Sequence, residues 1–346
     1  MTRRSQGHPG PLGRGLAAVL WCILLANAGP AGAAEFVTAA SEDPAPWRGT
    51  SLVYRNVATA ISFDRGADLT YNPYYAMTFQ VSPRWWFGRI FWVGADAGLS
   101  SEITNSDTDT KRSEILWNDT LVRGGASRFY RIPWVGIEFS GGLDLIAPTS
   151  KLSQARSLYL GLRPSLGVAR TFPLLKGLTL FYSLQGTKFF NEYTTSSRKS
   201  PLIPGCSGGS CDPYLNSGLR NPEWRVTNLG GISMEFTDWI GLSASAGLVM
   251  DFLYPQETED PSVSFQPQEG QDDRRYTMVY EMEVHTRPMP SLGIAIGAST
   301  VNPQLRPNST YEDPFINRYT TVYVDITFYV DGLVSQIMKA KGRKSI

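Results

Sequence analysis

Hydrophobic and polar residues alternate with a period of two along much of this chain, in stretches of about ten residues or more that turn or loop residues separate. The alternation is clearest over residues 69–82, 242–254, 276–285 and 322–330. In the last of these, Val322, Val324 and Ile326 alternate with Tyr323 and Asp325. Successive side chains of a β-strand point to opposite faces, so the pattern predicts strands with one apolar and one polar face.

Segments of this kind occur throughout the chain. The candidate strands are 51–63, 69–82, 89–101, 113–126, 134–147, 156–171, 177–191, 223–237, 240–254, 274–287, 291–303 and 318–330. The phase is ambiguous in the first and fourth segments, because Arg55 and Asp119 interrupt whichever face is taken as apolar, and Pro73 and Pro164 each remove a ladder hydrogen bond. The total is even, as in closed bacterial barrels. We predict an all-β fold: a transmembrane antiparallel up-and-down β-barrel of about twelve strands.

The connections between these segments alternate in length. The short ones are 83–88, 128–133, 172–176, 237–239 and 287–290, and the long ones are 102–112, 148–155, 192–222, 255–273 and 302–317. Only the first hairpin, 64–68, is short where a long loop is expected. Because outer-membrane barrels have short periplasmic turns and longer outer loops, we expect both termini in the periplasm. We also expect an aromatic girdle near the short turns, formed by Trp85, Trp86, Phe87, Phe91, Phe129, Tyr130, Trp134, Phe172 and Trp239.

Residues 1–34 have the features of an export signal. Arg3, Arg4 and Arg14 precede an apolar run over 16–26, and small residues follow at 31–34. That run is shorter than the roughly 20 apolar residues that a transmembrane helix needs. The predicted organisation is therefore a signal peptide at 1–34, a periplasmic segment at 35–50, the barrel at 51–330 and a basic periplasmic tail at 331–346.

The composition of the polar face separates a membrane barrel from a soluble β protein. A soluble sheet covers its outer face with charged residues, whereas here that face is mostly Ser, Thr, Gly, Asn and Gln. This suits a lumen. Only 18% of the residues are charged and the net charge is +1, so no nucleic-acid partner is expected.

In its pattern of strands, the chain from about Ser51 to Val330 resembles the general class of Gram-negative outer-membrane β-barrels. The resemblance implies a location in the bacterial outer membrane, contact with its lipid and lipopolysaccharide, and insertion by the outer-membrane assembly machinery. The class usually ends on an aromatic residue, whereas Phe328 and Tyr329 are followed here by a further tail. The chain therefore departs from the class at this position.

Charged residues on the predicted inner face are the candidates for lining the lumen: Asp96, Glu138, Asp144, Arg163, Lys188, Arg225, Glu235, Asp251, Glu281, Glu283, His285 and Asp325. If the lumen is open, their excess of acids would favour cations or polar neutral solutes. If it is closed, the same charges would pair across the interior.

His285 is the one histidine after the predicted signal, and it follows Glu281 and Glu283 on one strand face. It is either a general base oriented by a carboxylate or part of a polar cluster in the wall. Because no serine motif accompanies it, we expect the polar cluster and no enzymatic activity. No cofactor and no metal site are expected.

Three features lie outside the strands. Cys206 and Cys211 flank a short polar stretch and are expected to form a local disulfide. The loop acids Glu257, Glu259, Asp260, Glu269, Asp272 and Asp273 either bind calcium or form a solvated loop. The tail from Asp331 has apolar residues at helical spacing followed by basic ones, so it lies on the membrane surface, plugs the lumen, docks a periplasmic partner or is disordered.

These observations leave two functions. The first is a narrow channel or transport component for small polar or cationic solutes, with the inward acids as its selectivity residues. The second is a non-conducting structural or docking barrel in a cell-envelope assembly for export or surface machinery.

Overall fold

Almost all of the regular structure is β-strand. The computed structural model describes residues 45–60, 74–104, 113–197, 216–255, 273–304, 310–311, 313 and 315–341. The strands are β1 (Ser51–Thr59), β2 (Tyr75–Ser82), β3 (Arg84–Phe87), β4 (Phe91–Glu102), β5 (Ile115–Trp117), β6 (Thr120–Ile132), β7 (Ile137–Ala147), β8 (Leu158–Phe172), β9 (Gly177–Asn191), β10 (Thr195–Ser197), β11 (Asn216–Arg220), β12 (Pro222–Glu235), β13 (Ile240–Leu253), β14 (Arg274–Met289), β15 (Leu292–Pro303) and β16 (Thr320–Tyr329). The helices are α2 (Lys151–Ala155) and α3 (Val330–Ala340).

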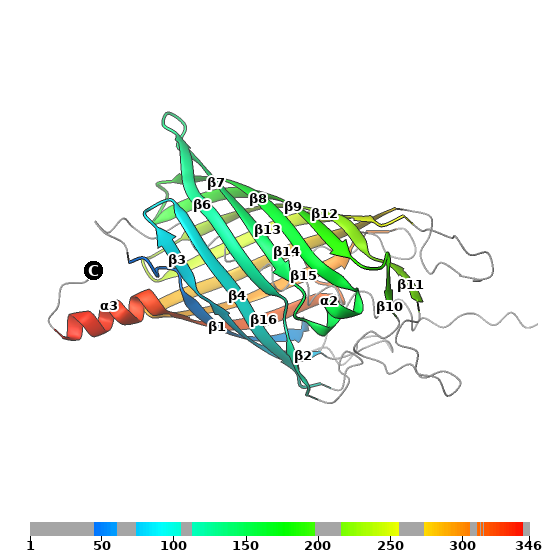
Figure 1. Ribbon diagram of the computed structural model, residues 1–346. Coiled ribbons are helices and arrows are strands. Elements are labelled where there is room, and N and C mark those ends of the chain that lie inside the picture. The colour runs from blue at the N-terminus through cyan, green and yellow to red at the C-terminus, as the bar shows by residue number, and fades with distance from the viewer. Residues whose placement is uncertain are drawn as a thin grey trace, which may run out of the picture.

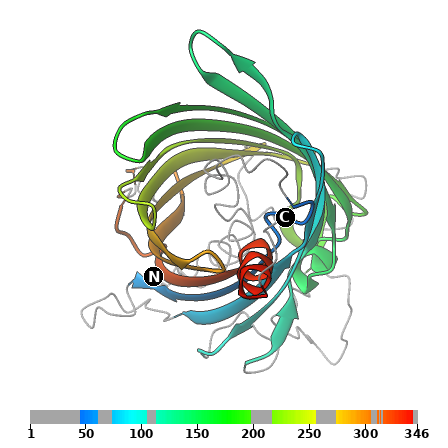
Figure 2. The same cartoon turned by 90° about the vertical axis from the view of Figure 1, so that its left-hand side faces the viewer.

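The strands close into an antiparallel barrel (Figures 1 and 2). One sheet holds 14 strands, and the pairings of β1 with β16 and of β2 with β4 complete the ring. β2 and β3 both pair with one side of β4, and β5 and β6 both pair with its other side. Each of these two pairs is one wall segment with an interruption, so the barrel has 12 strands, as predicted.

The two interruptions have local causes. Pro83 separates β2 from β3, because proline has no N–H to donate to the ladder. Asn118 and Asp119 separate β5 from β6. The Asp119 carboxylate accepts hydrogen bonds from Ser150 N at 2.9 Å and Ser153 Oγ at 2.5 Å. The predicted strand 113–126 was ambiguous in phase because Asp119 belongs to neither β5 nor β6 but lies between them.

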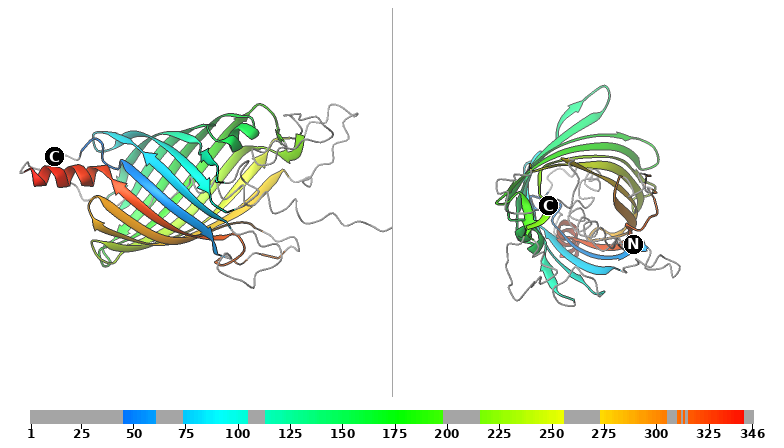
Figure 3. Two further views of the ribbon diagram at one scale, coloured as in Figure 1. Left: turned by 90° about the horizontal axis from the view of Figure 1, so that it is seen from below. Right: turned by 90° about the vertical axis from the view of Figure 1, so that its right-hand side faces the viewer.

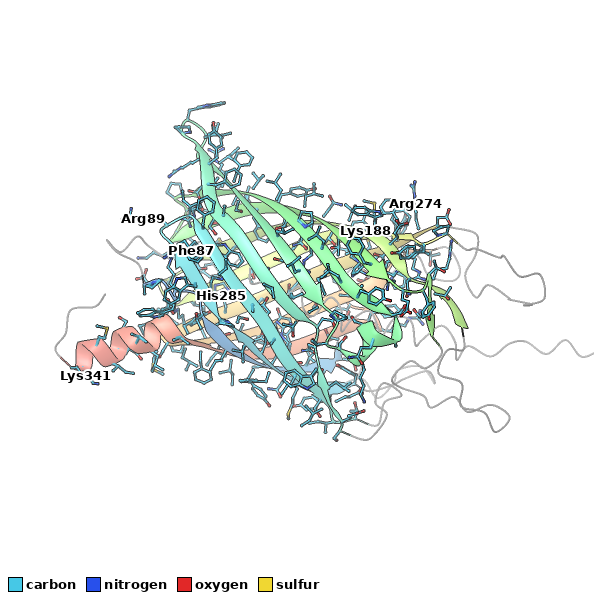
Figure 4. The ribbon with its side chains drawn as sticks, viewed as in Figure 1. Phe87, Arg89, Lys188, Arg274, His285 and Lys341 are labelled. Atoms are coloured by element: carbon cyan, nitrogen blue, oxygen red, sulfur yellow. The ribbon has the colours of Figure 1, made fainter. Side chains whose placement is uncertain are left out.

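Apolar side chains cover the outside of the barrel wall, and polar ones lie inside. Val324 is 39% exposed, whereas the next residue along β16, Asp325, is 6% exposed. The same alternation holds on β14, where Met282 is exposed and Glu283 is buried. The side chains drawn in Figure 4 show the outward set around the ribbon. An outer surface of large exposed hydrophobic residues is stable only in contact with lipid or another apolar surface.

Large aromatic side chains fit on the inner face because glycines lie opposite them. Trp92 on β4 is in register with Gly125 on β6, and Tyr323 on β16 is in register with Gly297 on β15. A methyl group on Gly125 would lie 2.9 Å from the Trp92 indole, and one on Gly297 would collide with the Tyr323 ring. The absence of a side chain lets each ring lie flat across the neighbouring strand.

The two ends of the barrel differ in their connections. Short turns join β3 to β4, β8 to β9, β12 to β13 and β14 to β15 at one end, where β1 begins and β16 finishes, with Ser51 opposite Tyr329. The other end carries the long connections, which include α2 and the pair β10–β11. The alternation of lengths was predicted correctly between the later strands. The first hairpin differs, because β1 ends at Thr59 and β2 begins at Tyr75, and the turn predicted at 64–68 lies outside the described residues. Which end faces the periplasm stays a prediction.

The turn predicted at 128–133 is wrong. The ladder between β6 and β7 shifts register after Ala126 and resumes at Tyr130 and Phe139, so the turn falls at 133–136. Arg128, at the shift, has a φ of 50°. The bulge adds residues to one strand, and the resulting hairpin rises past the rim at the upper left of Figure 1.

Helix α3 continues directly from β16 and leaves the barrel at the short-turn end (Figures 1 and 3). Its base is held by Val330 N, which donates to Thr50 O at 3.0 Å, and by Ser291 Oγ, which donates to Gln336 Oε1 at 2.9 Å. Leu333 and Ile337, one turn apart, are exposed. Over its described residues the tail does not enter the barrel, so the plug alternative is wrong there. No helix in the described part of the chain is long and apolar enough to cross a membrane.

Candidate functional site: the inner face of the barrel

The middle of one wall holds a row of ion pairs across β4, β6, β7 and β8. Arg123 on β6 contacts Asp96 on β4 at 2.9 Å and Asp144 on β7 at 3.2 Å. Arg163 on β8 contacts the other carboxylate oxygen of Asp144 at 2.7 Å. In an antiparallel sheet, opposed residues have side chains on the same face, so one arginine can join acids from both neighbouring strands. We call these residues the central ion pairs.

An acidic cluster lies between the middle of the barrel and the short-turn end, on β1, β14 and β16. We define it by Arg55, Glu281, Glu283, Tyr323 and Asp325. Arg55 binds Asp325 through two hydrogen bonds, of 2.7 and 2.6 Å. The Tyr323 hydroxyl faces Glu281 Oε1 at 2.7 Å and Glu283 Oε2 at 3.0 Å. Arg55 also lies 4.3 Å from the centroid of the Tyr323 ring, so one cation and one hydroxyl hold three acids together.

His285 adjoins this cluster nearer the short turns. Its Nε2 atom lies 3.0 Å from Glu235 Oε1 on β12, and its Nδ1 atom lies 3.8 Å from Glu283 Oε1. Gly241 lies opposite it on β13, where a methyl group would contact both the imidazole and Glu235. A general base needs a ring nitrogen aimed at its substrate. Because both ring nitrogens face carboxylates, the geometry is that of a polar cluster in the wall.

An arginine cluster lies near the other end, below the long connections. We define it by Arg156, Arg220, Arg225 and Arg275, with the acids Asp251 and Asp273. Arg225 binds the fully buried Asp251 carboxylate at 2.7 and 3.2 Å. Arg275 donates to Arg220 O at 2.9 Å, and Arg220 binds the exposed Asp273 at 2.7 Å.

Arg156, between α2 and β8, completes this cluster. Its carbonyl oxygen accepts hydrogen bonds from Asn191 Nδ2 at 2.8 Å and Asn221 Nδ2 at 3.0 Å. Burial and the nearby charges of Arg225 and Arg275 lower the pKa of Arg156 to about 10. Arg156 therefore remains a cation at neutral pH among other cations.

Eleven of the lumen-lining candidates occupy strand positions that face the inside of the barrel: Asp96, Glu138, Asp144, Arg163, Arg225, Glu235, Asp251, Glu281, Glu283, His285 and Asp325. All make an inward ion pair or hydrogen bond, including Glu138, which contacts Arg128 at 3.1 Å. That they line a conducting lumen stays a prediction.

The prediction that Lys188 lines the lumen is wrong, because Lys188 occupies a position of β9 that faces outward (Figure 4). It is in register with Leu162 on β8 and Trp224 on β12, and it shares its face with the exposed Tyr182. Its Nζ atom lies 2.5 Å from Glu223 Oε1 and 4.9 Å from the Trp224 ring centroid. A lysine near a strand end can follow an apolar surface with its stem and reach polar partners with its charge. The prediction that Trp86 belongs to the outer aromatic girdle is also wrong, because Trp86 faces inward and its Nε1 donates to Arg48 O at 2.9 Å.

The structure also adds cations that the sequence analysis left out of the inner face: Arg55, Arg123, Arg156, Arg220 and Arg275. The side chain of Arg55 points inward because Arg55 is in register with Asp325 on β16. That register cannot be read from the sequence of either strand alone. Arg220 lies outside the predicted strands, so alternation could not place it, and Arg156 is the first residue of the predicted strand 156–171 but precedes β8 in the structure. These arginines offset the expected excess of acids on the inner face of the described residues. That excess was the reason to expect a preference for cations, so this reason is removed.

Cys206, Cys211 and the loop acids from Glu257 to Asp272 lie outside the described residues, so the predicted disulfide and the calcium alternative remain predictions. The same holds for the signal peptide at 1–34. Within the described residues, no group of three or more His, Cys, Asp and Glu side chains is arranged to hold a metal ion.

The fold and the inner face together define the class of this protein. In lipid, strands satisfy their backbone hydrogen bonds only in a closed barrel, and such barrels place apolar residues outward and polar residues inward. This chain does both. It is an outer-membrane β-barrel of the general bacterial class, and its location is the bacterial outer membrane.

Solved structures of similar fold are also outer-membrane barrels. The outer membrane channel COG4313 of Pseudomonas putida F1 is 10% identical with a TM-score of 0.49, and the similarity covers 85% of this chain and 99% of that one. The KdgM porin is 9% identical with a TM-score of 0.42, covering 80% and 98%. The translocator domain of the autotransporter NalP from Neisseria meningitidis is 11% identical with a TM-score of 0.38, covering 90% and 96%.

The sequence comparisons assign no family. No family model matches the chain. A stretch of 142 residues is 30% identical to the bradyzoite-formation deficient protein 1 of Toxoplasma gondii, but it covers 39% of this chain and 6% of that protein. The class of the protein therefore follows from the barrel itself.

Proposed function

We propose that the protein is a narrow channel for small polar solutes across the outer membrane. The observation that supports this most directly is the polar, ionic inner face of a barrel whose outer face is apolar. A core built only for stability favours apolar side chains, because pairing buried charges seldom repays their desolvation. Charges along the whole inner face are instead the usual lining of an aqueous path.

The ion pairs set the expected selectivity. The central ion pairs and the acidic cluster both combine carboxylates with arginines, so neither wall presents acids alone. We therefore place small polar solutes ahead of cations as the substrate class. A barrel of 12 strands is narrower than the 16- to 18-stranded porins, so the solutes are expected to be small.

Conductance tests this function directly. Purified protein in planar bilayers should give steady single-channel steps. Tryptophan in place of the inward Ser245 should lower the step size, whereas tryptophan in place of its outward neighbour Ala246 should not, because the two side chains lie on opposite faces of β13. Absence of steps from the natural protein, or equal steps from Ser245→Trp and Ala246→Trp, would reject a path through the barrel.

One observation favours the docking barrel as a second candidate function. Helix α3 extends away from the rim and exposes Leu333 and Ile337 on one side. If a periplasmic partner covers this stripe, Leu333→Ser should abolish co-purification of that partner and leave conductance unchanged. Co-purification therefore tests the docking function and conductance tests the channel, so the two functions can be judged separately.

A further inference from the structure

The outer face of the barrel carries a row of opposed residues near the end with the long connections. Lys188 on β9 is in register with Trp224 on β12. Phe252 on β13 is in register with both Trp224 and Arg274 on β14. Opposed side chains share one face of a sheet, and these positions alternate with inward ones such as Arg225, so the row faces outward. We call Lys188, Trp224, Phe252 and Arg274 the outer row; Figure 4 shows its two cations near this end of the wall.

The two cations of the outer row differ in their protein contacts. Arg274 is exposed, and its guanidinium carbon lies 5.3 Å from the centroid of the Phe252 ring. Among the described residues, that guanidinium makes no hydrogen bond and no ion pair. The Lys188 Nζ atom contacts Glu223 Oε1 at 2.5 Å and lies 4.9 Å from the centroid of the Trp224 ring. Both cations are thus held against aromatic rings, and Arg274 keeps all of its donors available to a ligand.

The position of the outer row matches the depth of lipid headgroups. Within the described strands of the barrel wall, every other cation faces inward or lies near the short-turn end. A charge on the lipid-facing side of a wall is costly in the hydrocarbon region and is tolerated near the interface. Trp224 is 48% exposed, and amphipathic rings of this kind gather at the level of the headgroups. The outer row therefore lies where anionic headgroups are within reach of its cations.

We propose that the outer row binds the phosphorylated disaccharide headgroup of lipopolysaccharide in the outer leaflet. A guanidinium binds phosphate through paired hydrogen bonds, and an ammonium binds it as a point charge. Three strand spacings, about 14 Å, separate Lys188 from Arg274, so a disaccharide with two phosphates can offer one to each cation. A phospholipid with one phosphate reaches only one of them. The site goes beyond the proposed function, because it does not depend on whether a solute passes through the barrel.

The test is a titration of the full-length protein in detergent with purified diphosphoryl lipid A, the phosphorylated disaccharide anchor of lipopolysaccharide. Arg274→Gln should weaken binding by about tenfold, because it removes hydrogen bonds from a charged group to phosphate. The matched control is Arg170→Gln on β8 at the short-turn end. Arg170 is also exposed and lies 4.4 Å from the centroid of the Phe172 ring, so this variant removes the same charge and the same kind of ring contact. Equal affinity in the two variants would overturn the site.

Monophosphoryl lipid A tests whether two phosphates bind two cations. The natural protein should bind the diphosphoryl form about tenfold more tightly than the monophosphoryl form, because the second phosphate gains a charged partner. In one of the two variants Arg274→Gln and Lys188→Gln, this preference should largely disappear, because the cation that holds the removed phosphate is already absent. A preference that both variants retained in full would contradict the proposal.

A further variant should change affinity in the opposite direction. The Glu223 side chain is 33% exposed and is the carboxylate that contacts Lys188, so Glu223→Gln removes an anion that competes with the lipid. Binding of diphosphoryl lipid A should tighten by about two- to threefold. Unchanged or weaker binding would count against the site even if Lys188→Gln failed to fold.

Two other measurements separate this inference from its rivals. If Arg274→Gln changed the oligomeric state in detergent and left the affinity for lipid A unchanged, the outer row would be an interface between copies of the chain, and the proposal would be overturned. Lipid A binding that depends on Arg274 in a barrel without conductance would support the site and reject the channel. Conductance without lipid A binding would support the channel and reject the site.

Discussion

The acidic cluster and the arginine cluster lie toward opposite ends of one barrel and have opposite majority charges. In the acidic cluster, Arg55 is the single cation among Glu281, Glu283 and Asp325. In the arginine cluster, Asp251 is the buried anion among several guanidinium groups. In each cluster one minority residue holds together neighbours that repel one another. The minority charge of each cluster should therefore matter most for stability, and the majority charges most for selectivity.

The largest expected effect comes from removing the minority charge of the arginine cluster. Asp251→Ala leaves Arg225 buried beside other cations, and loss of one partner from a buried pair costs about 3–5 kcal/mol. Urea unfolding of the barrel in detergent, followed by tryptophan fluorescence and heat-dependent gel mobility, measures this loss. The control is Asp238→Ala, whose carboxylate is 83% exposed and should change stability by less than about 0.5 kcal/mol. Equal losses would show that Asp251 has no special role.

A smaller effect is expected in the acidic cluster, because Tyr323 contributes a hydroxyl rather than a charge. Tyr323→Phe leaves two carboxylates without a shared donor and should lower the free energy of unfolding by about 1–3 kcal/mol. Tyr182→Phe is the matched control, because its hydroxyl donates to Asn228 on the exposed outer face. If the control lost as much stability as Tyr323→Phe, the hydroxyl would not be what holds the acids.

The position of Tyr323 depends in turn on Gly297. Gly297→Ala adds a methyl group that collides with the ring, so we expect a loss of about 1 kcal/mol and a weakened contact with the acids. Gly186→Ala on β9 is the control, since nothing lies within 4 Å of the added methyl group. In the Tyr323→Phe background the cost of Gly297→Ala should be largely retained, because the phenyl ring still fills the space. Loss of that cost would point to a different cause.

The smallest effect is expected from the tail, which belongs to neither cluster. Ending the chain after Val330 removes most of α3, which extends away from the barrel. Single-channel conductance should therefore stay the same. An increase on truncation would show that the tail reaches the lumen after all.

Much of the fold could be predicted from the residues alone. Strand length and the side of the wall on which each residue lies follow from alternation within one segment, so most of the inner-face candidates were placed correctly. Lys188 was misplaced because it was assigned by its charge rather than by the phase that Tyr182 and Leu184 set. The extension of β6 was missed because the bulge after Ala126 changes the phase within a single segment.

Alternation along the chain is enough to predict long strands with two different faces, and in lipid such strands must close into a cylinder. Which charges meet depends on how the strands pair in three dimensions. Asp251 lies between Arg225 and Arg275 because of the register of three strands, and Arg156 joins them from a connection about seventy residues earlier in the chain. Alternation is a property of neighbouring residues, whereas register is fixed only when every strand of the closed ring has paired with both of its neighbours.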